Sequence, residues 1–305
     1  MRRNLAYQYL NAIEKNLKLG ASKHSAKKDK SSGKNSNIYS YASREEMVDF
    51  AWNISKFLKS NYPEVKFVKD VKSEHVQAFL NEKACTCTDK TLKQYVSRAN
   101  KLKNLVNKTY KVNTKLDIVA PKSCSSRQSN RDKQMSLEHY KKLESTLSGN
   151  GLKAAKLAKN FGLRVESMSK LQKRDFNLEK GYLNIVGDKG GRDRKIPFET
   201  SEQYNLAKYM RETVREDFDR VIPISAAGIN SAIRRGLERV KLNNEYKTTN
   251  IHSIRKLYAQ ETFDRYRAEG KGIKEAKGLV SKRLGHNFKR GEDKDLTAIY
   301  IKEIK

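Results

Sequence analysis

Apolar residues recur every three or four positions along most of the chain, the spacing of helices that bury one face. In the first half this spacing predicts a short helix within residues 1–19, a helix that begins near Ser43, a short one from Ser73 and a long one from Thr88. Serine and threonine are favoured at these positions because their side chains accept a hydrogen bond from the first turn. The pattern therefore predicts a small helical bundle over residues 43–120.

The second half is also mainly helical, but its period changes once. Alternating apolar residues on both sides of Gly187-Asp188-Lys189-Gly190-Gly191 predict a β-hairpin, with glycines where the turn needs positive φ. Helical spacing begins at Ser136 and is predicted at about residues 152–161, 164–171, 202–218, 226–240, 252–268, 274–284 and 295–302. The fold is expected to be mainly α with a small antiparallel β-sheet.

Two polar stretches divide the chain. Residues 21–37 carry lysines, serines and almost no apolar side chain, and residues 121–134 combine Pro121 with a serine-rich run and scattered basic residues. We expect a partly flexible basic extension over 1–42, the helical domain over 43–120, a linker over 121–134 and a second domain over 135–305.

The net charge narrows the choice of partner. Lysines and arginines number 65 against 35 acidic residues, a formal charge of +30, which favours a polyanion as partner. Nucleic acid is the first candidate, and an anionic membrane surface is the alternative. Against the membrane, the mean hydropathy is −0.85, no apolar run approaches the length of a spanning helix, and the start of the chain lacks a signal peptide. We expect a soluble, cytoplasmic protein associated with nucleic acid.

Specific basic residues are candidates for phosphate contacts. The polar face of the helix that begins near Thr88 carries Lys90, Lys93 and Lys101, and Arg192 and Arg194 follow the predicted hairpin turn. A solvated helix face or turn would show the same pattern, so these five positions are only candidates for DNA binding.

The cysteines suggest no metal site. Cys85, Cys87 and Cys124 make an odd number with no second pair at zinc spacing. We expect reduced thiols with a structural or incidental part, and a regulatory thiol or metal site is the alternative. The sequence also has no acidic cluster of the metal-nuclease kind, so no cofactor or metal is expected.

Five separated fragments of the second half resemble the tyrosine recombinases of the phage-integrase family. They occur in the family's order, each on the type of element where the family would place it. The fragments are Gly162-Leu163-Arg164, Gly187-Asp188-Lys189-Gly190-Gly191-Arg192, His252-Ser253-Ile254-Arg255, Leu284-Gly285-His286 and Thr297-Ala298-Ile299-Tyr300-Ile301. Over residues 43–120 the resemblance is architectural only, to the helical core-binding domain that precedes the catalytic domain.

The residues themselves agree with phosphoryl transfer. Guanidinium groups such as those of Arg164 and Arg255 neutralise the charge on the non-bridging phosphate oxygens in the transition state. His252 lies three residues before Arg255 on a predicted helix, so both side chains leave the same face. Taken alone, each of these arginines would be interpreted as a surface residue and His252 as a helix-cap or surface histidine.

The resemblance implies a role for each of six residues. Tyr300 would be the nucleophile that forms a covalent 3′-phosphotyrosine, and Lys189 the general acid for the departing 5′ oxygen. His286 would donate a hydrogen bond to the phosphate, and His252 would either do the same or act as acid and base with the nucleophile. Arg164 and Arg255 would clamp that phosphate. An unperturbed phenol, with a pKa near 10, is a weak nucleophile at neutral pH, so the surrounding cations and histidines must assist it. Without the other fragments, Tyr300 would be taken for a core tyrosine.

Three features depart from the family's pattern. The family commonly places an acidic residue three positions after the first arginine, where this chain has Ser167 and an acid one position earlier, Glu166. The interval between His286 and Tyr300 is longer than in compact members, which suggests a loop that controls entry of the tyrosine. Only five residues follow Tyr300, so the assembly contact is expected to differ from that of relatives with a longer tail or to lie upstream of Tyr300.

The function that the resemblance implies is site-specific recombination or integration. The two domains would form a C-shaped clamp around double-stranded DNA, and four protomers on two duplexes would exchange strands through a Holliday junction. The alternatives are relaxation of DNA by a type IB topoisomerase-like enzyme and DNA binding without catalysis.

Overall fold

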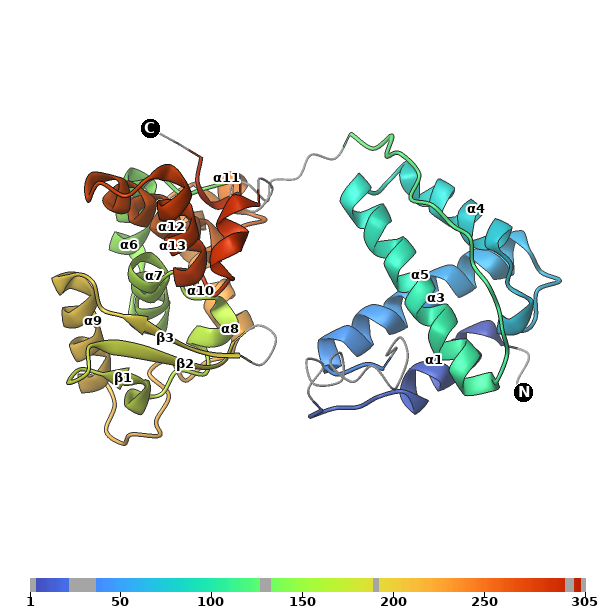
Figure 1. The fold of residues 1–305 in the computed structure, drawn as a ribbon, viewed down its shortest axis with the longest axis horizontal. Helices are drawn as coiled ribbons and strands as arrows, with labels where there is room; N and C mark the ends of the chain where they lie inside the picture. The colour runs from blue at the N-terminus through green and yellow to red at the C-terminus, as the bar shows by residue number, and fades with distance from the viewer. Residues whose placement is uncertain (1–3, 22–36, 127–132, 189–191, 294–298, 303–305) are drawn as a thin grey trace. The chain divides into compact units, whose positions relative to one another are not determined.

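The computed structural model describes residues 4–21, 37–126, 133–188, 192–293 and 299–302. The chain divides into two compact units, Met1–Ser129 and Asn130–Lys305, each with its own hydrophobic core (Figure 1). The sheet lies in the second unit, with helices around it. The predicted fold class, mainly α with a small antiparallel sheet, is confirmed.

The first unit is a bundle of four α-helices within the described residues. Its aromatic core includes Phe50 and Phe79, whose rings meet edge to face at 5.9 Å, and Phe79 also stacks on Tyr95. The elements are α1 (Leu5–Lys15), α3 (Tyr41–Asn61), the short 3₁₀-helix η2 (Val68–Asp70), α4 (Ser73–Ala84) and α5 (Asp89–Tyr110).

Serine and threonine hydroxyls at or near the N-termini of α3, α4 and α5 accept backbone hydrogen bonds. Thr88 caps α5 as predicted, because its hydroxyl accepts from the backbone N–H of Thr91. The start predicted at Ser43 was three residues late: Ser40 is extended, and its hydroxyl accepts from the N–H of Ser43 at 3.2 Å. Ser73 opens α4 as its first helical residue, and its hydroxyl accepts instead from the N–H of Asp117.

Helix α1 belongs to the core of this unit. The Gln8 side chain is buried, donates to the Lys66 carbonyl at 3.0 Å and accepts from the Val68 N–H at 3.0 Å. Tyr9 and Ile13 are buried beside it. This part of the 1–42 segment therefore packs with the bundle, whereas most of the predicted flexible stretch lies outside the described residues.

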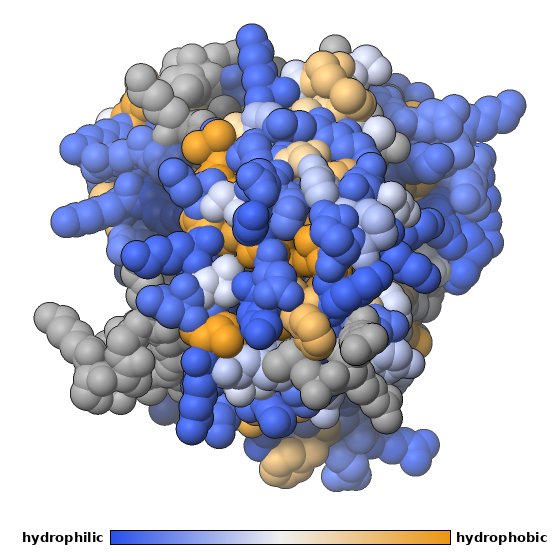
Figure 2. Space-filling view, turned by 90° about the vertical axis from the view of Figure 1, so that its right-hand side faces the viewer, coloured by the Kyte–Doolittle hydropathy of each residue, from blue (hydrophilic) through white to orange (hydrophobic). Residues whose placement is uncertain are grey.

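Polar side chains dominate the face of the first unit that Figure 2 shows. Hydrophilic side chains cover most of its area, and apolar ones appear between them. Two cysteines of the first unit meet: the sulfur atoms of Cys85 and Cys124 lie 3.4 Å apart as free thiols. Their contact joins the end of α4 to the segment that follows α5.

The second unit places helices around a three-stranded antiparallel sheet of order β1-β2-β3. Its strands are β1 (Phe176–Asn177), β2 (Tyr182–Asp188) and β3 (Arg192–Pro197), and its longer helices are α6 (Leu137–Thr146), α7 (Gly149–Phe161), α9 (Ser201–Glu212), α10 (Ala226–Arg239), α12 (Ile251–Ala268) and α13 (Ile273–Arg283). The short helical turns are α8 (Val165–Met168), η4 (Lys173–Asp175), α11 (Asn243–Tyr246) and η5 (Phe288–Glu292). The predicted hairpin is present as β2 and β3, and its tip at 189–191 lies outside the described residues.

Some second-unit elements differ from the prediction. Helix α9 ends at Glu212 instead of continuing to 218, and further along the chain the side chain of Asp219 accepts from the N–H of Glu216 in a turn. The predicted helix 164–171 is the single turn α8. Strand β1 was missed because two residues carry no detectable period. The predicted helix 295–302 is helical at 299–300, and residues 294–298 lie outside the described residues.

Helix α12 is the central element of this unit. It packs against α7 on one side and α13 on the other, so it is buried over almost all of its circumference. Even Arg255 and Lys256 are fully buried, an unusual position for charged side chains unless they are hydrogen-bonded. The partners of Arg255 belong to the candidate active site.

Candidate active site

A left-handed glycine sets the position of Arg164. Gly162 ends α7 with φ of +58°, and a Cβ there would lie 2.3 Å from Cδ1 of Tyr258. Leu163 is then buried in the core, which fixes the path of the chain. Arg164 follows at the N-cap position of α8, half-buried, with its side-chain contacts on the β2 side. The Gly-Leu-Arg fragment is therefore a helix stop that presents an arginine.

Arg255 holds two of the sequence fragments together. From α12 its Nη1 donates to the carbonyl of Gly162, and its Nη2 donates to the carbonyl of Leu284 at 2.7 Å. The same guanidinium thus ties the backbone beside Arg164 to the backbone beside His286. Burial lowers the pKa of Arg255 from its usual value to about 10. The positive charge of Arg164 acts in the same direction, so an anion at this point would be stabilised.

Tyr300 lies against this arginine and two histidines. Its ring is buried, and Cζ of Arg255 lies 5.7 Å from the ring centroid. Its hydroxyl oxygen lies 3.4 Å from Nε2 of His252, and the ring of His286 is 6.1 Å away between centroids. Just beyond, the N–H of Lys302 donates to the side-chain oxygen of Gln260 at 2.8 Å, which fastens this segment to α12.

A carboxylate on β2 completes the group. Asp188 Oδ2 accepts from Nη1 of Arg164 at 2.7 Å and from Nε of Arg194 at 2.9 Å, and Oδ1 accepts from the Ser167 hydroxyl at 2.9 Å. Desolvation lowers the pKa of Arg194, and the negative charge of Asp188 opposes that shift. No role was predicted for Asp188 from the sequence, although it is an acid within one of the five fragments.

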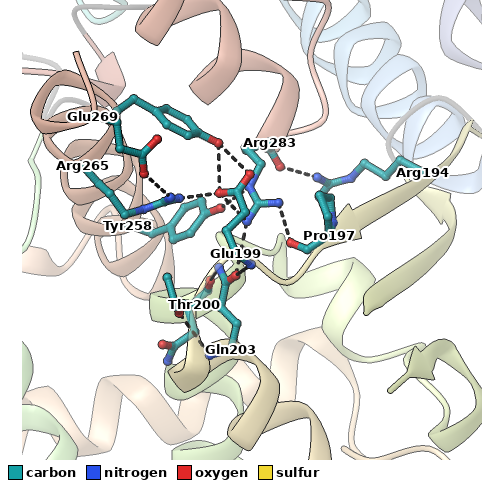
Figure 3. Close-up of polar contacts among 11 residues, drawn as sticks. Arg194, Pro197, Glu199, Thr200, Gln203, Tyr258, Arg265, Glu269 and Arg283 are labelled. Carbon is teal, nitrogen blue, oxygen red and sulfur yellow. Dashed lines mark hydrogen bonds and ion pairs between the residues drawn. The ribbon is translucent and has the colours of Figure 1, made fainter. Parts of the chain in front are cut away.

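A second polar network adjoins the site through Arg194 (Figure 3). The Arg283 side chain, 6% exposed, donates to the Pro197 carbonyl at 2.6 Å and forms an ion pair with Glu199 at 3.2 Å. Glu199 also accepts from Tyr266 and Arg265 of α12. The carbonyl of Arg283 in turn accepts from Nη1 of Arg194 at 2.5 Å. These bonds join β3, α12 and α13 around the arginine cluster.

The structure brings together five of the six residues predicted to be catalytic. They come from α8, α12, the turn after α13 and the C-terminal segment, and they are Arg164, His252, Arg255, His286 and Tyr300. Lys189 lies outside the described residues. Their catalytic roles stay predictions, because proximity alone does not show chemistry.

The five predicted DNA contacts occupy different settings. Lys90 and Lys93 are exposed on α5, and Lys101 is half-buried on the same helix. Arg194 lies within the arginine cluster, its side chain 13% exposed. Arg192 opens β3, and its side chain lies outside what the structure describes.

The described part of the chain offers no other obvious chemistry. Within it no three His, Cys, Asp or Glu side chains are grouped so that they could hold a metal ion. None of its helices is both long and apolar enough to cross a membrane. What the site can do follows from its own groups: guanidinium and imidazole side chains surround a phenol, an arrangement suited to binding an oxyanion beside an oxygen nucleophile.

Comparison with known proteins gives a short match in sequence and a long one in structure. No family model matches the chain. A stretch of 50 residues is 42% identical to tyrosine recombinase XerA of Pyrococcus furiosus and 38% identical to its counterpart from Pyrococcus horikoshii. The stretch covers 16% of this chain and 18% of each relative.

Solved structures match over nearly the whole chain. The XerH site-specific recombinase, bound to a palindromic difH substrate in a post-cleavage complex, matches 99% of this chain and 92% of its own, with a TM-score of 0.64 at 14% identity. Lambda integrase, a dimer on a COC′ core site, matches 93% and 79% with a TM-score of 0.61 at 15% identity. The Tn1549 transposon integrase, in complex with a circular intermediate DNA, matches 99% and 96% with a TM-score of 0.58 at 14% identity.

Proposed function

We propose that this chain, which has the fold of the tyrosine recombinases, is a site-specific DNA recombinase or integrase. One observation carries the proposal: the Tyr300 hydroxyl, the imidazole of His252 and the buried guanidinium of Arg255 converge, with Arg164 next to them. A phenol in such surroundings can attack a phosphate that the arginines hold. The DNA-bound solved structures of the same fold support the same function.

The proposed cleavage step conserves the number of phosphoester bonds. The phenolic oxygen of Tyr300 forms a bond to the scissile phosphorus, and the bond from phosphorus to the 5′ oxygen breaks. The phenol proton passes to His252 or to water, and the leaving 5′ oxygen takes a proton from a general acid, for which Lys189 is the candidate. Attack by a 5′ hydroxyl on the phosphotyrosine reverses the step, so rejoining needs no ATP.

Arg164 and Arg255 would stabilise the charge on the non-bridging oxygens, and His286 would donate a further hydrogen bond. The net charge of +30 supports duplex DNA as the partner. Four protomers on two duplexes, with exchange through a Holliday junction, is the assembly that we propose.

Covalent capture tests the proposal. A pool of nicked duplexes with a randomised core is incubated with the protein and denatured, and protein–DNA adducts are isolated and sequenced. Tyr300→Phe should abolish the adducts while retaining DNA affinity, because only the attacking oxygen is lost. Tyr209→Phe, at a tyrosine that is 45% exposed, is the matched control and should form adducts normally.

Two results would contradict the proposal: adducts that persist in Tyr300→Phe, or no adduct with any member of the pool. Once a site has been captured, two intact duplexes that carry it should yield junctions and recombinants. Relaxation of a supercoiled plasmid without exchange would favour the topoisomerase alternative.

A further inference from the structure

A single buried carboxylate lies between two arginines of the candidate site. The Asp188 side chain is 5% exposed and binds Arg164 at 2.7 Å through Nη1 and Arg194 at 2.9 Å through Nε. Both bonds end on the same oxygen, Oδ2, while Oδ1 accepts from the Ser167 hydroxyl. Charge-assisted bonds of this length are the stronger class of hydrogen bond in proteins, so Asp188 fixes both guanidinium groups.

A β-bulge turns Asp188 toward the arginines. Leu183 and Ile185 alternate as buried residues of β2, and regular alternation would bury position 187 next. The register instead shifts between Ile185 and Asp188, so that Val186 and Gly187 are both exposed and Asp188 is buried. Gly187 takes φ of +62° in this bulge. One additional residue in β2 therefore re-aims the carboxylate.

The charges nearby make this carboxylate necessary. Arg164, Arg194 and Arg255 lie close enough that the positive charges of Arg164 and Arg194 both lower the pKa of Arg255. Three buried or half-buried cations repel one another unless anions separate them. Asp188 neutralises part of this charge and leaves an excess of positive charge that a phosphate can match.

Ser167 explains why the carboxylate comes from the strand. It occupies the position three residues after Arg164, where the resembled family commonly has an acid, and serine supplies no charge there. Its hydroxyl is instead a hydrogen-bond donor to Asp188. The acid is thus present in the fold but is contributed by another element.

We propose that Asp188 is a positioning residue, which holds Arg164 and Arg194 for the scissile phosphate and takes the part left open by Ser167. This inference rests on the proposed function. Gly285 fits the same picture, because a Cβ there would lie 2.9 Å from both Asp188 Oδ2 and Arg194 Nε. The Leu-Gly-His turn thus closes directly over the ion pair.

The test compares Asp188→Asn, the double variant Ser167→Glu/Asp188→Asn and Glu179→Gln. The first removes the charge with almost no change in shape, the second returns an acid from α8, and the third removes the charge of an exposed glutamate near the same hairpin. For each full-length variant, the rate constant of adduct formation on captured nicked DNA and the dissociation constant for that DNA are measured separately. Thermal unfolding is recorded in parallel.

Asp188→Asn should lower the rate constant about a hundredfold, the usual cost of a misplaced catalytic group, with the dissociation constant changed less than about threefold. The double variant should recover at least about tenfold of that loss. Glu179→Gln should behave as wild type. The proposal is wrong if Asp188→Asn reacts like wild type, or if rate, affinity and stability fall together and Ser167→Glu restores none of them.

A readout that needs no catalysis separates this inference from the proposed function. In NMR spectra of the free protein, the Arg194 Nε–H should exchange slowly with water because it donates to Asp188, and Asp188→Asn should accelerate the exchange at least about tenfold. Unchanged exchange would overturn the positioning role even if DNA is cleaved. If Asp188→Asn accelerates the exchange but the wild-type protein forms no adduct through Tyr300, the contact between Asp188 and Arg194 is supported and the recombinase chemistry is refuted.

Discussion

At the residue scale, the site depends on glycines at positions where neighbouring atoms leave no room for a Cβ. Gly162 and Gly285 both have positive φ, and both would place a Cβ within 3 Å of a side chain that belongs to the site or supports it. The glycines of the Gly-Leu-Arg and Leu-Gly-His fragments are therefore needed for geometry, whereas Arg164 and His286 beside them are needed for the proposed chemistry.

Gly285→Ala tests this distinction. The change should cost about 1–2 kcal/mol of stability from the left-handed backbone, and the methyl group should also displace Asp188 and Arg194. Gly270→Ala is the control, because Gly270 has φ of +84° with nothing within 4 Å of its Cβ. Urea unfolding should give similar backbone costs, but only Gly285→Ala should slow adduct formation, by at least about tenfold. Equal adduct rates in the two variants would rule out a role for the close approach.

At the element scale, β3, α12 and α13 are fastened together by Glu199. Glu199 accepts from Tyr266 at 2.9 Å and pairs with the buried Arg283, whose carbonyl binds Arg194. The network thereby connects the packing of three elements to the arginine cluster (Figure 3). Loss of the Glu199 charge would remove the carboxylate that pairs with the buried Arg283 among the described residues.

Glu199→Gln should lower the free energy of unfolding by about 1–3 kcal/mol, because it leaves a buried guanidinium partly unpaired. Glu212→Gln, an exposed acid in the last turn of α9, should be neutral or slightly stabilising, since a negative charge at a helix C-terminus is unfavourable. Urea titrations of both variants measure the difference. A Glu199→Gln midpoint equal to that of Glu212→Gln would show that the network adds nothing to stability.

At the scale of the whole molecule, the dominant property is the excess of positive charge. A net charge of +30 predicts DNA binding that weakens steeply with salt, because phosphate contacts release counterions. Between about 50 and 200 mM salt the affinity should fall by about a thousandfold or more if six or more phosphates are contacted.

The double variant Lys90→Gln/Lys93→Gln tests whether α5 contributes to the salt dependence of DNA affinity. If both exposed lysines contact phosphate, the slope of log affinity against log salt should decrease by about two. Lys208→Gln removes one positive charge from an exposed position on α9. It serves as the control for the loss of a lysine charge outside α5. Fluorescence anisotropy with a labelled duplex gives the slopes. A slope unchanged in the double variant would remove α5 from the DNA-binding surface.

The sequence by itself determined most of the elements and most of the candidate site. Helices with a buried face and a capped start, such as α5 after Thr88, are specified locally. His252 and Arg255 share a helix face by spacing alone. The resemblance also implied that Arg164, Arg255 and Tyr300 meet, because the five fragments occur in the family's order although each one alone is a weak signal.

Only the tertiary structure decided the rest, since those features depend on contacts between distant segments. Ser167 shows that an expected acid is missing, but the replacement at Asp188 depends on a bulge in β2 that shifts a side chain from one face to the other. Likewise, a sequence cannot show that Arg255 is fully buried and bonded to the backbone of Gly162. Spacing determines which residues lie on one face of a helix, whereas tertiary packing determines what that face meets.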